Sequence, residues 1–161
     1  MTGTKIPRPK AVKALIVLEV LFGAMGIISG ILLMSDPSGA LIGFQHAMAE
    51  KIPSQSFFLV GLFLFFIYGL YPLFLAHGAW TRGELFFSEI SKAGGIHWSW
   101  QGGIALVAIL IAWLFMENLL IGLDYPATYM TIAMGLAIFI ALVMPSTRRY
   151  FSVSAGTGDE R

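Results

Sequence analysis

Four long stretches of apolar residues, separated by short polar connections, form the main pattern along this chain of 161 residues. The first stretch contains a single charged residue, Glu19, and the second contains none between positions 57 and 76. A helix of about 18 or more apolar residues crosses the ~30 Å hydrocarbon core of a bilayer, because it satisfies its own backbone hydrogen bonds there. The pattern predicts membrane-spanning helices at about 14–34, 57–78, 102–123 and 127–145.

Two connections have helical patterns of their own. Within 40–52, apolar residues recur at spacings of three and four, which predicts a short amphipathic helix in the membrane interface. A loop packed over the helix ends is the alternative. Around 80–92, mixed apolar and acidic residues predict that the second helix extends past the bilayer until Gly94 and Gly95 end it.

The composition supports a membrane protein and leaves no room for a separate soluble domain. Hydrophobic residues make up 57% of the chain, charged residues 12%, and the mean hydropathy is +0.80. A soluble domain is roughly half apolar and a quarter charged. We therefore expect a single all-α domain over 1–161, an integral membrane four-helix bundle.

The basic residues predict how the bundle is oriented. Nine of the ten Lys and Arg residues fall on one side of the four runs, and Lys51 alone falls on the other. Basic loops face the cytoplasm in most membrane proteins, so both termini are expected to be cytoplasmic in a cell membrane. A cleaved signal peptide is the alternative for the first run, although that run is long for the ~7–15 apolar residues of a signal core.

The chain has no cysteine. This excludes disulfides, thiolate nucleophiles, iron–sulfur clusters, c-type haem attachment and thiol redox pairs. No phosphate-binding loop follows a strand, and the basic N-terminus is explained by topology, so nucleic acid is not an expected partner.

Small residues form one face of the first predicted helix. Gly23, Gly26 and Gly30 follow Glu19 at spacings of four, three and four, which places all of them on one side. Such a face lets another helix approach closely, and van der Waals packing drives helix association in lipid. The neighbour is either a helix of the same chain, which we favour, or a second subunit.

Glu19 is the first candidate for a ligand or proton site. It lies about six residues beyond Lys13, or ~9 Å into the cytoplasmic half of the membrane. Tyr68, Tyr71 and His77 on the second helix are expected in the same half. A buried carboxyl group hydrogen-bonded to a tyrosine is the favoured interpretation; a proton or substrate path and a subunit contact are the alternatives.

Glu117 and Asn118 form the second candidate site. Glu117 lies seventeen residues after Trp100, or ~25 Å along the third helix, and is therefore too far from Glu19 to pair with it. Asp36 and His46 are expected on the same side of the membrane. These four residues outline a polar pocket beneath the connection at 40–52, or else an exposed helix end.

The histidines do not predict a metal or haem site. A transmembrane b-type haem needs two axial histidines that face each other inside the bundle, whereas His77 and His97 are expected at its rim and His46 on the opposite side. No local spacing of ligands suits zinc. We expect no cofactor; haem b and quinone belong only to the least favoured interpretation.

Several short motifs carry a resemblance to known proteins. They are the segments 36–39, 97–100, 117–122 and 145–150, which read DPSG, HWSW, ENLLIG and PSTRRY. Together they resemble a widespread group of small prokaryotic four-helix membrane proteins, a group that implies a fold and no activity. The helix count is also similar to that of the DoxX-like proteins, some of which are membrane subunits of quinone-linked oxidoreductases.

Three functions follow from these patterns. The favoured one is a non-catalytic accessory or scaffold subunit that associates with other membrane proteins or with copies of itself. The first alternative is a bundle that binds or moves a small molecule, proton or lipid through Glu19 and the cytoplasmic end of the second helix. The second alternative is a membrane subunit of a quinone-linked oxidoreductase.

Overall fold

The computed structural model of the chain describes residues 8–44, 48, 50–83 and 87–152. Its described part is helical, with one isolated bridge between Ile96 and Ser152. The elements, in chain order, are α1 (Lys10–Ser35), η1 (Ala40–Ile42), α3 (Phe58–Phe63), η2 (Leu64–Leu70), α4 (Tyr71–Thr81), α5 (Ser88–Gly94), α6 (Trp98–Leu120), α7 (Pro126–Val143) and α8 (Pro145–Phe151).

Four of the helical segments are long and apolar enough to cross a membrane. They are Lys10–Ser35, the continuous segment Phe58–Thr81, Trp98–Leu120 and Pro126–Val143. The expected all-α arrangement with four long apolar helices is thus confirmed. α6 begins four residues earlier than predicted because the side chain of His97, its N-cap residue, accepts a hydrogen bond from the backbone N–H of Ser99.

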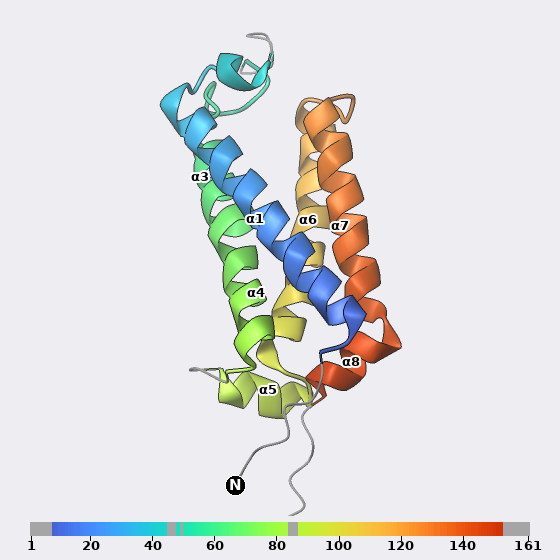
Figure 1. Cartoon of the computed structure of the whole chain (residues 1–161). Helices are drawn as coiled ribbons and strands as arrows, with labels where there is room; N and C mark the ends of the chain where they lie inside the picture. Colours follow the sequence, from blue (N-terminus) through green and yellow to red (C-terminus); the bar gives the residue numbers. More distant parts are fainter. Residues whose placement is uncertain (1–7, 45–47, 49, 84–86, 153–161) are drawn as a thin grey trace, which may run out of the picture.

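The long helices form two pairs, α1 with the second membrane-spanning helix and α6 with α7, and the pairs meet where α1 contacts α7. α1 packs lengthwise against α3, η2 and α4, and α6 packs against both α4 and α7. In Figure 1, α1 crosses the front of the molecule diagonally and approaches α7 where α8 begins. We call the end of the bundle that carries α5 and α8 the basic end, and the opposite end the η1 end.

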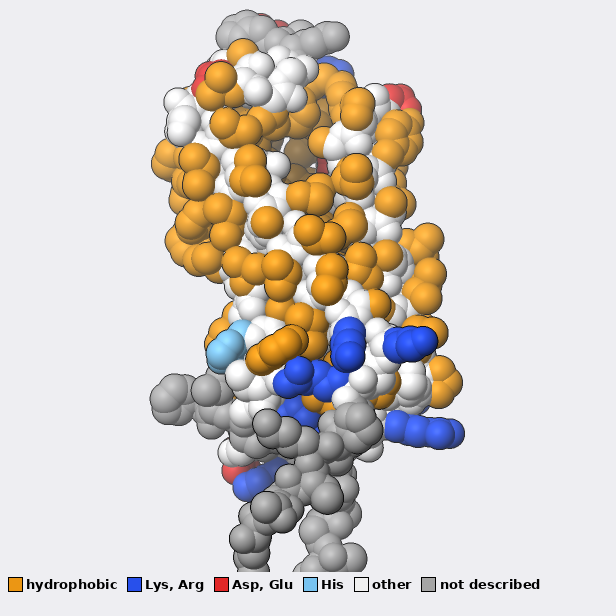
Figure 2. Space-filling view, viewed as in Figure 1, with side chains coloured by type: hydrophobic (Ala, Val, Ile, Leu, Met, Phe, Trp, Pro, Cys, Tyr) orange, Lys and Arg blue, Asp and Glu red, His pale blue; other side chains and the backbone are white. Residues whose placement is uncertain are grey.

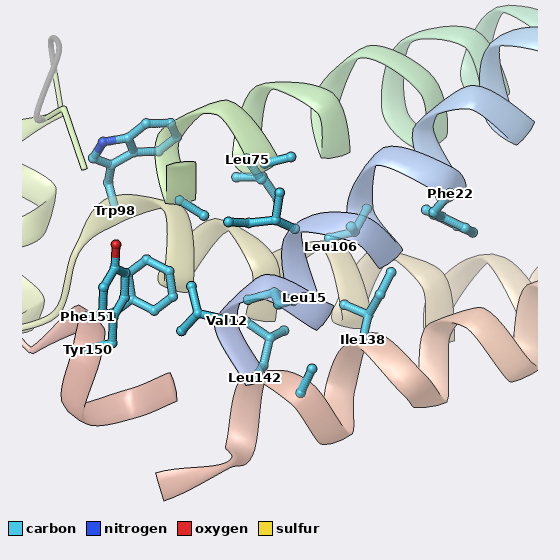
Figure 3. Packing of buried hydrophobic residues seen from close by; sticks show 14 of the residues in the cluster. Val12, Leu15, Phe22, Leu75, Trp98, Leu106, Ile138, Leu142, Tyr150 and Phe151 are labelled. Atoms are coloured by element: carbon cyan, nitrogen blue, oxygen red, sulfur yellow. The ribbon is translucent and has the colours of Figure 1, made fainter. Parts of the chain in front are cut away.

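The half of the bundle next to the basic end has a closely packed core. Val12, Leu142 and Phe151 have no exposed surface, and Leu15 and Leu75 are each 1% exposed. Figure 3 shows these side chains converging from α1, α4, α7 and α8. This core joins all four long helices near the basic end.

α8 closes the bundle at the basic end. The backbone N–H of His97 donates to the carbonyl of Phe151 at 2.8 Å, and the indole N–H of Trp100 donates to the carbonyl of Leu142 at 3.0 Å. Pro145 at the first position of α8 breaks the hydrogen-bond ladder after α7 and lets the chain turn there. The start of α6 is thereby fixed to the end of α7.

The second membrane-spanning helix contains a π-helical segment, η2. Pro72 has no N–H to donate to the carbonyl of Tyr68, and its ring would clash with that carbonyl in a regular α-helix. The ladder shifts accordingly, and the N–H of Tyr71 bonds the carbonyl of Phe66 five residues back. π-helical segments occur often at functional sites, and this one ends just after Tyr68 and Gly69.

Both connections were expected to be helical. Within 40–52, residues 40–42 form η1 and Met48 is helical, while 45–47 and 49 lie outside the described part, so the amphipathic helix expected there stays a prediction. Within 80–92, the second helix does not extend without a break: Arg82 adopts the left-handed conformation (φ 53°), which ends α4 at Thr81. α5 is a separate helix, and Gly95 (φ 64°) ends it, as the sequence predicts.

The surface separates apolar and basic side chains. In Figure 2, apolar side chains cover most of the visible face and basic side chains gather toward the basic end. Arg8 and Arg82 each lie over an aromatic ring there, at 4.1 Å from Trp80 and 4.8 Å from Tyr150. This distribution suits a bundle whose middle faces lipid and whose basic end faces headgroups.

Candidate functional site

The glycine face of α1 packs against the second helix of the same chain. A Cβ added at Gly26 would lie 2.3 Å from the backbone carbonyl atoms of Tyr68, and one at Gly30 would lie 2.7 Å from the backbone nitrogen of Phe65. At Gly23 the nearest atom is Cγ of Leu73, at 2.7 Å. The two backbones therefore touch along this face, which leaves it unavailable to a second subunit.

The half of the bundle next to the η1 end contains a cavity of about 210 Å³. Its walls come from α1, from the second helix, and from α6 and α7, for example Met25, Leu64, Trp113 and Thr131. Residues from the connection after α1 and from the start of the second helix cover its end. The volume is large enough for a small molecule, since one water occupies ~30 Å³ of the liquid.

The cavity opens sideways toward the surface that is expected to face lipid. Figure 2 shows a hollow between α1 and α7 near the η1 end, with acidic side-chain atoms on its wall. Glu117 of α6 is the acidic residue among those that line the cavity.

Three residues with polar side chains, Glu117, Thr128 and Tyr68, lie in the walls of this cavity. The hydroxyl of Thr128, which is 2% exposed, donates a hydrogen bond to the carboxyl group of Glu117. Tyr68, on η2, is 3% exposed and within electrostatic range of Glu117. Its hydroxyl has no hydrogen-bond partner among the described residues. The hydroxyl itself is buried, so a ligand in the cavity would meet the carboxyl group of Glu117 rather than this hydroxyl.

Aromatic side chains hold the Tyr68 ring in place. The ring lies 5.2 Å from that of Phe22 and 5.1 Å from that of Phe63, measured between centroids. Trp113 stacks on Phe63 at 4.6 Å and meets Tyr68 edge-on at 6.2 Å. Trp113 lies one helical turn before Glu117 on α6, so its indole and the carboxyl group face the same cavity.

The structure does not assemble the four residues expected at the second candidate site. Glu117 lines the cavity, whereas Asn118 is exposed on another side of α6. Asp36 accepts hydrogen bonds from the Ser38 hydroxyl at 2.7 Å and from the N–H of Leu41 at 3.1 Å, which stabilises the turn after α1. His46 lies outside the described residues.

The hydrogen bonds to Asp36 change its acidity. The pKa of its carboxyl group is lowered from the ordinary value, chiefly because the hydroxyl of Ser38 donates to the carboxylate and also because backbone N–H groups of the turn do so. The carboxylate is therefore part of the turn that leads into η1.

Glu19 is buried, at 1% exposure, as its position predicts. The expected hydrogen bond to a tyrosine is absent: Oε2 of Glu19 has no partner among the described residues, and the Tyr71 hydroxyl donates to the carbonyl of Gly102 at 3.0 Å. Tyr71 does lie within electrostatic range of Glu19. Tyr68 does not belong to this site, because it packs against Gly26, seven residues or ~10 Å along α1.

The histidines at the basic end do not converge. His77 is exposed on α4, whereas His97 is 2% exposed and its Nδ1 lies 2.8 Å from the Ser99 hydroxyl. Among the described residues, no group of three or more His, Asp or Glu side chains could hold a metal ion.

Two residues of the cavity, Trp113 and Thr128, were not among those expected from the sequence. Both lie within apolar runs, where a tryptophan or a threonine is unremarkable. Glu117 and Thr128 are eleven residues apart across the turn between α6 and α7. A short connection between two antiparallel helices brings residues near it together, and this is the one signal that could have linked them.

Comparisons of the chain with protein-family models, with curated proteins and with solved structures found no match. The functional proposal therefore rests on the geometry of the cavity.

Proposed function

We propose that this protein is a multi-pass membrane protein that binds a small amphipathic molecule in the cavity between α1, η2, α6 and α7. The observation that carries this proposal is an apolar, laterally open cavity whose lining includes one carboxyl group, that of Glu117. Ligand sites typically combine mostly apolar walls with a few polar groups that orient the ligand.

The packing of the bundle supports binding in preference to a purely structural role. A bundle stabilised by helix contacts alone gains from closing its interior, because atoms that line a void lose dispersion contacts. The cavity also keeps a carboxyl group and a phenol among apolar walls, where polar groups without a ligand are costly. Both features are explained if a ligand fills the space.

The accessory-subunit hypothesis remains a second proposal, but one of the features behind it does not favour it. That hypothesis used the glycine face of α1 as a surface for partners, and this face packs against Tyr68 and Phe65 of the same chain. No specific contact in the described residues favours the oxidoreductase hypothesis.

We also propose that the basic end is cytoplasmic and that the cavity lies in the outer leaflet. The positive-inside rule supports this orientation. The chain has no native cysteine, so Ser54→Cys near the η1 end and Ser152→Cys near the basic end can be labelled with an impermeant maleimide in intact cells. Ser54→Cys should react. Labelling of Ser152→Cys but not of Ser54→Cys would show that the orientation is the opposite one.

Ligand binding can be tested with a bulky side chain that fills the cavity. The purified protein in nanodiscs of zwitterionic lipid is dialysed against radiolabelled 1-decanol, and binding to empty nanodiscs is subtracted. Saturable binding near one molecule per chain is expected. Thr131→Phe, which projects into the cavity, should abolish it, whereas Ile132→Phe on the neighbouring, 37% exposed position should not.

Ser29→Leu provides a second way to fill the cavity, from the α1 side. If Thr131→Phe does not fold, Ser29→Leu still tests whether filling the cavity prevents binding. Circular dichroism and size-exclusion chromatography show which variants are folded. Binding that persists in both folded variants, or no saturable binding in the unaltered protein, would overturn the proposed function.

A further inference from the structure

The charges around the cavity specify a class of ligand. Among the described residues that line it, Glu117 is the only charged one, and none of them is Lys, Arg or His. Among the described residues, the single ion pair is that between Lys92 and Glu89 on α5, so no described basic side chain neutralises Glu117. The cavity is therefore acidic, and an anionic ligand such as a fatty acid would be repelled.

The hydrogen-bonding capacity of Glu117 also favours a ligand that is not anionic. A carboxylate offers about four lone-pair positions, and Thr128 is the described side chain that occupies one of them. The remaining positions face an apolar space, where water is a poor substitute and a charged donor forms a strong hydrogen bond. A ligand group with several N–H donors fits this site better than a single hydroxyl group does.

The aromatic residues that line the cavity also favour a positively charged ligand. Trp113 and Tyr68 line the cavity beside Glu117, and the faces of aromatic rings attract cations that lie within about 6 Å. Carboxyl and aromatic groups together are a usual combination for binding an ammonium group.

We infer that the cavity binds a cationic amphiphile: a primary or substituted ammonium group at Glu117, near Trp113, with an apolar tail that leaves through the opening between α1 and α7. This inference rests on the proposed function and adds the charge of the ligand to it. The lateral opening means that the tail needs no space inside the 210 Å³ cavity and can lie among the lipid chains.

The experiment compares three probes that share one tail. Decylammonium, which is protonated at pH 7 like a lysine side chain, 1-decanol and decanoate are dialysed against the protein in zwitterionic nanodiscs. Decylammonium should bind at least about tenfold more tightly than 1-decanol, a difference of about 1.4 kcal/mol, and decanoate should bind more weakly than either.

Two variants assign the preference to one carboxyl group. Glu117→Gln keeps the shape and a hydrogen-bonding group while it removes the charge, so it should lower the affinity for decylammonium about tenfold more than the affinity for 1-decanol. Asp124→Asn makes the same charge change at an exposed position near the η1 end, outside the cavity lining, and should alter neither.

The outcomes separate this inference from the proposed function. Equal, saturable binding of decylammonium and 1-decanol, unchanged by Glu117→Gln, would overturn the cationic ligand and leave the cavity as a site for a neutral molecule. A charge preference that Asp124→Asn abolishes as strongly as Glu117→Gln would also overturn it, because surface charge would then explain the effect. No saturable binding of any probe would overturn the proposed function itself.

Discussion

The two halves of this bundle contain the same four helices and pack in opposite ways. Near the basic end, Leu15, Leu75 and Leu142 fill the space between helices, and α8 closes the end with backbone hydrogen bonds. Near the η1 end, the helices leave a cavity with an opening to the surface. The closed half supplies the stability that allows the other half to keep an unfilled, partly polar interior.

The contact at Gly26 lies where the two halves meet, and its loss should have the largest effect. Gly26→Leu forces a side chain into the backbone of Tyr68, which would separate α1 from η2 and destabilise the fold by about 3 kcal/mol or more. Ala24→Leu, on the exposed side of α1, is the matched control. Reversible unfolding in mixed micelles measures both; equal stability of the two variants would contradict the close packing.

Truncation of one leucine in each half directly compares how closely the two halves are packed. Leu142→Ala removes a side chain with no exposed surface and should cost about 2 kcal/mol through lost packing contacts. Leu120→Ala enlarges a cavity that already exists and should cost less than about 1 kcal/mol. The same unfolding assay compares them. Equal costs would mean that the two halves are packed alike.

Glu19 is a buried carboxyl group within the closed half. Glu19→Gln should change the free energy of unfolding by less than about 1 kcal/mol, because the carboxyl group has no ion-pair partner among the described residues and glutamine has nearly the same shape. Glu19→Asp, which shortens the side chain and leaves a void, is a useful contrast. If Glu19→Gln unfolds the protein, the carboxylate is charged and paired.

The smallest expected effect concerns the turn over the open half. The Ser38 hydroxyl is the main cause of the lowered pKa of Asp36, so Ser38→Ala should raise that pKa, as followed by NMR of the labelled carboxyl carbon. Because the folded pKa is lowered, the stabilisation is present above the unfolded pKa and is lost as the pH falls through the folded pKa. An unchanged pKa in Ser38→Ala would show that the hydroxyl does not bind the carboxylate.

The sequence predicts the four long helices and the close-packed face of α1, and the physical reason is that both depend on local patterns. Length and hydropathy are enough for the helices, and the spacing of Gly23, Gly26 and Gly30 is enough for the face. The break at Arg82 was not predictable in this way, because a left-handed non-glycine residue depends on its surroundings.

The candidate site could be predicted only in part. Glu117 is visible as a charge near the end of an apolar run, but its partners come from other helices, and their depth depends on how those helices align. Tyr68 was expected beside Glu19, whereas the contact of Gly26 with its backbone places it about two turns away and near Glu117. A cavity is the space that the packed helices leave empty, and no local sequence pattern predicts it.

The central claim is that the open half of the bundle binds the ammonium head of one amphiphile between α1, η2, α6 and α7, while its tail leaves through the lateral opening. The most direct measurement is photo-crosslinking in nanodiscs with a decylamine that carries a diazirine near its nitrogen, followed by mass spectrometry of the peptides. We expect adducts concentrated on residues that line the cavity, such as Met25, Trp113 and Met116, and their loss in Thr131→Phe. Adducts spread evenly over the lipid-facing surface, and unchanged in Thr131→Phe, would contradict the claim.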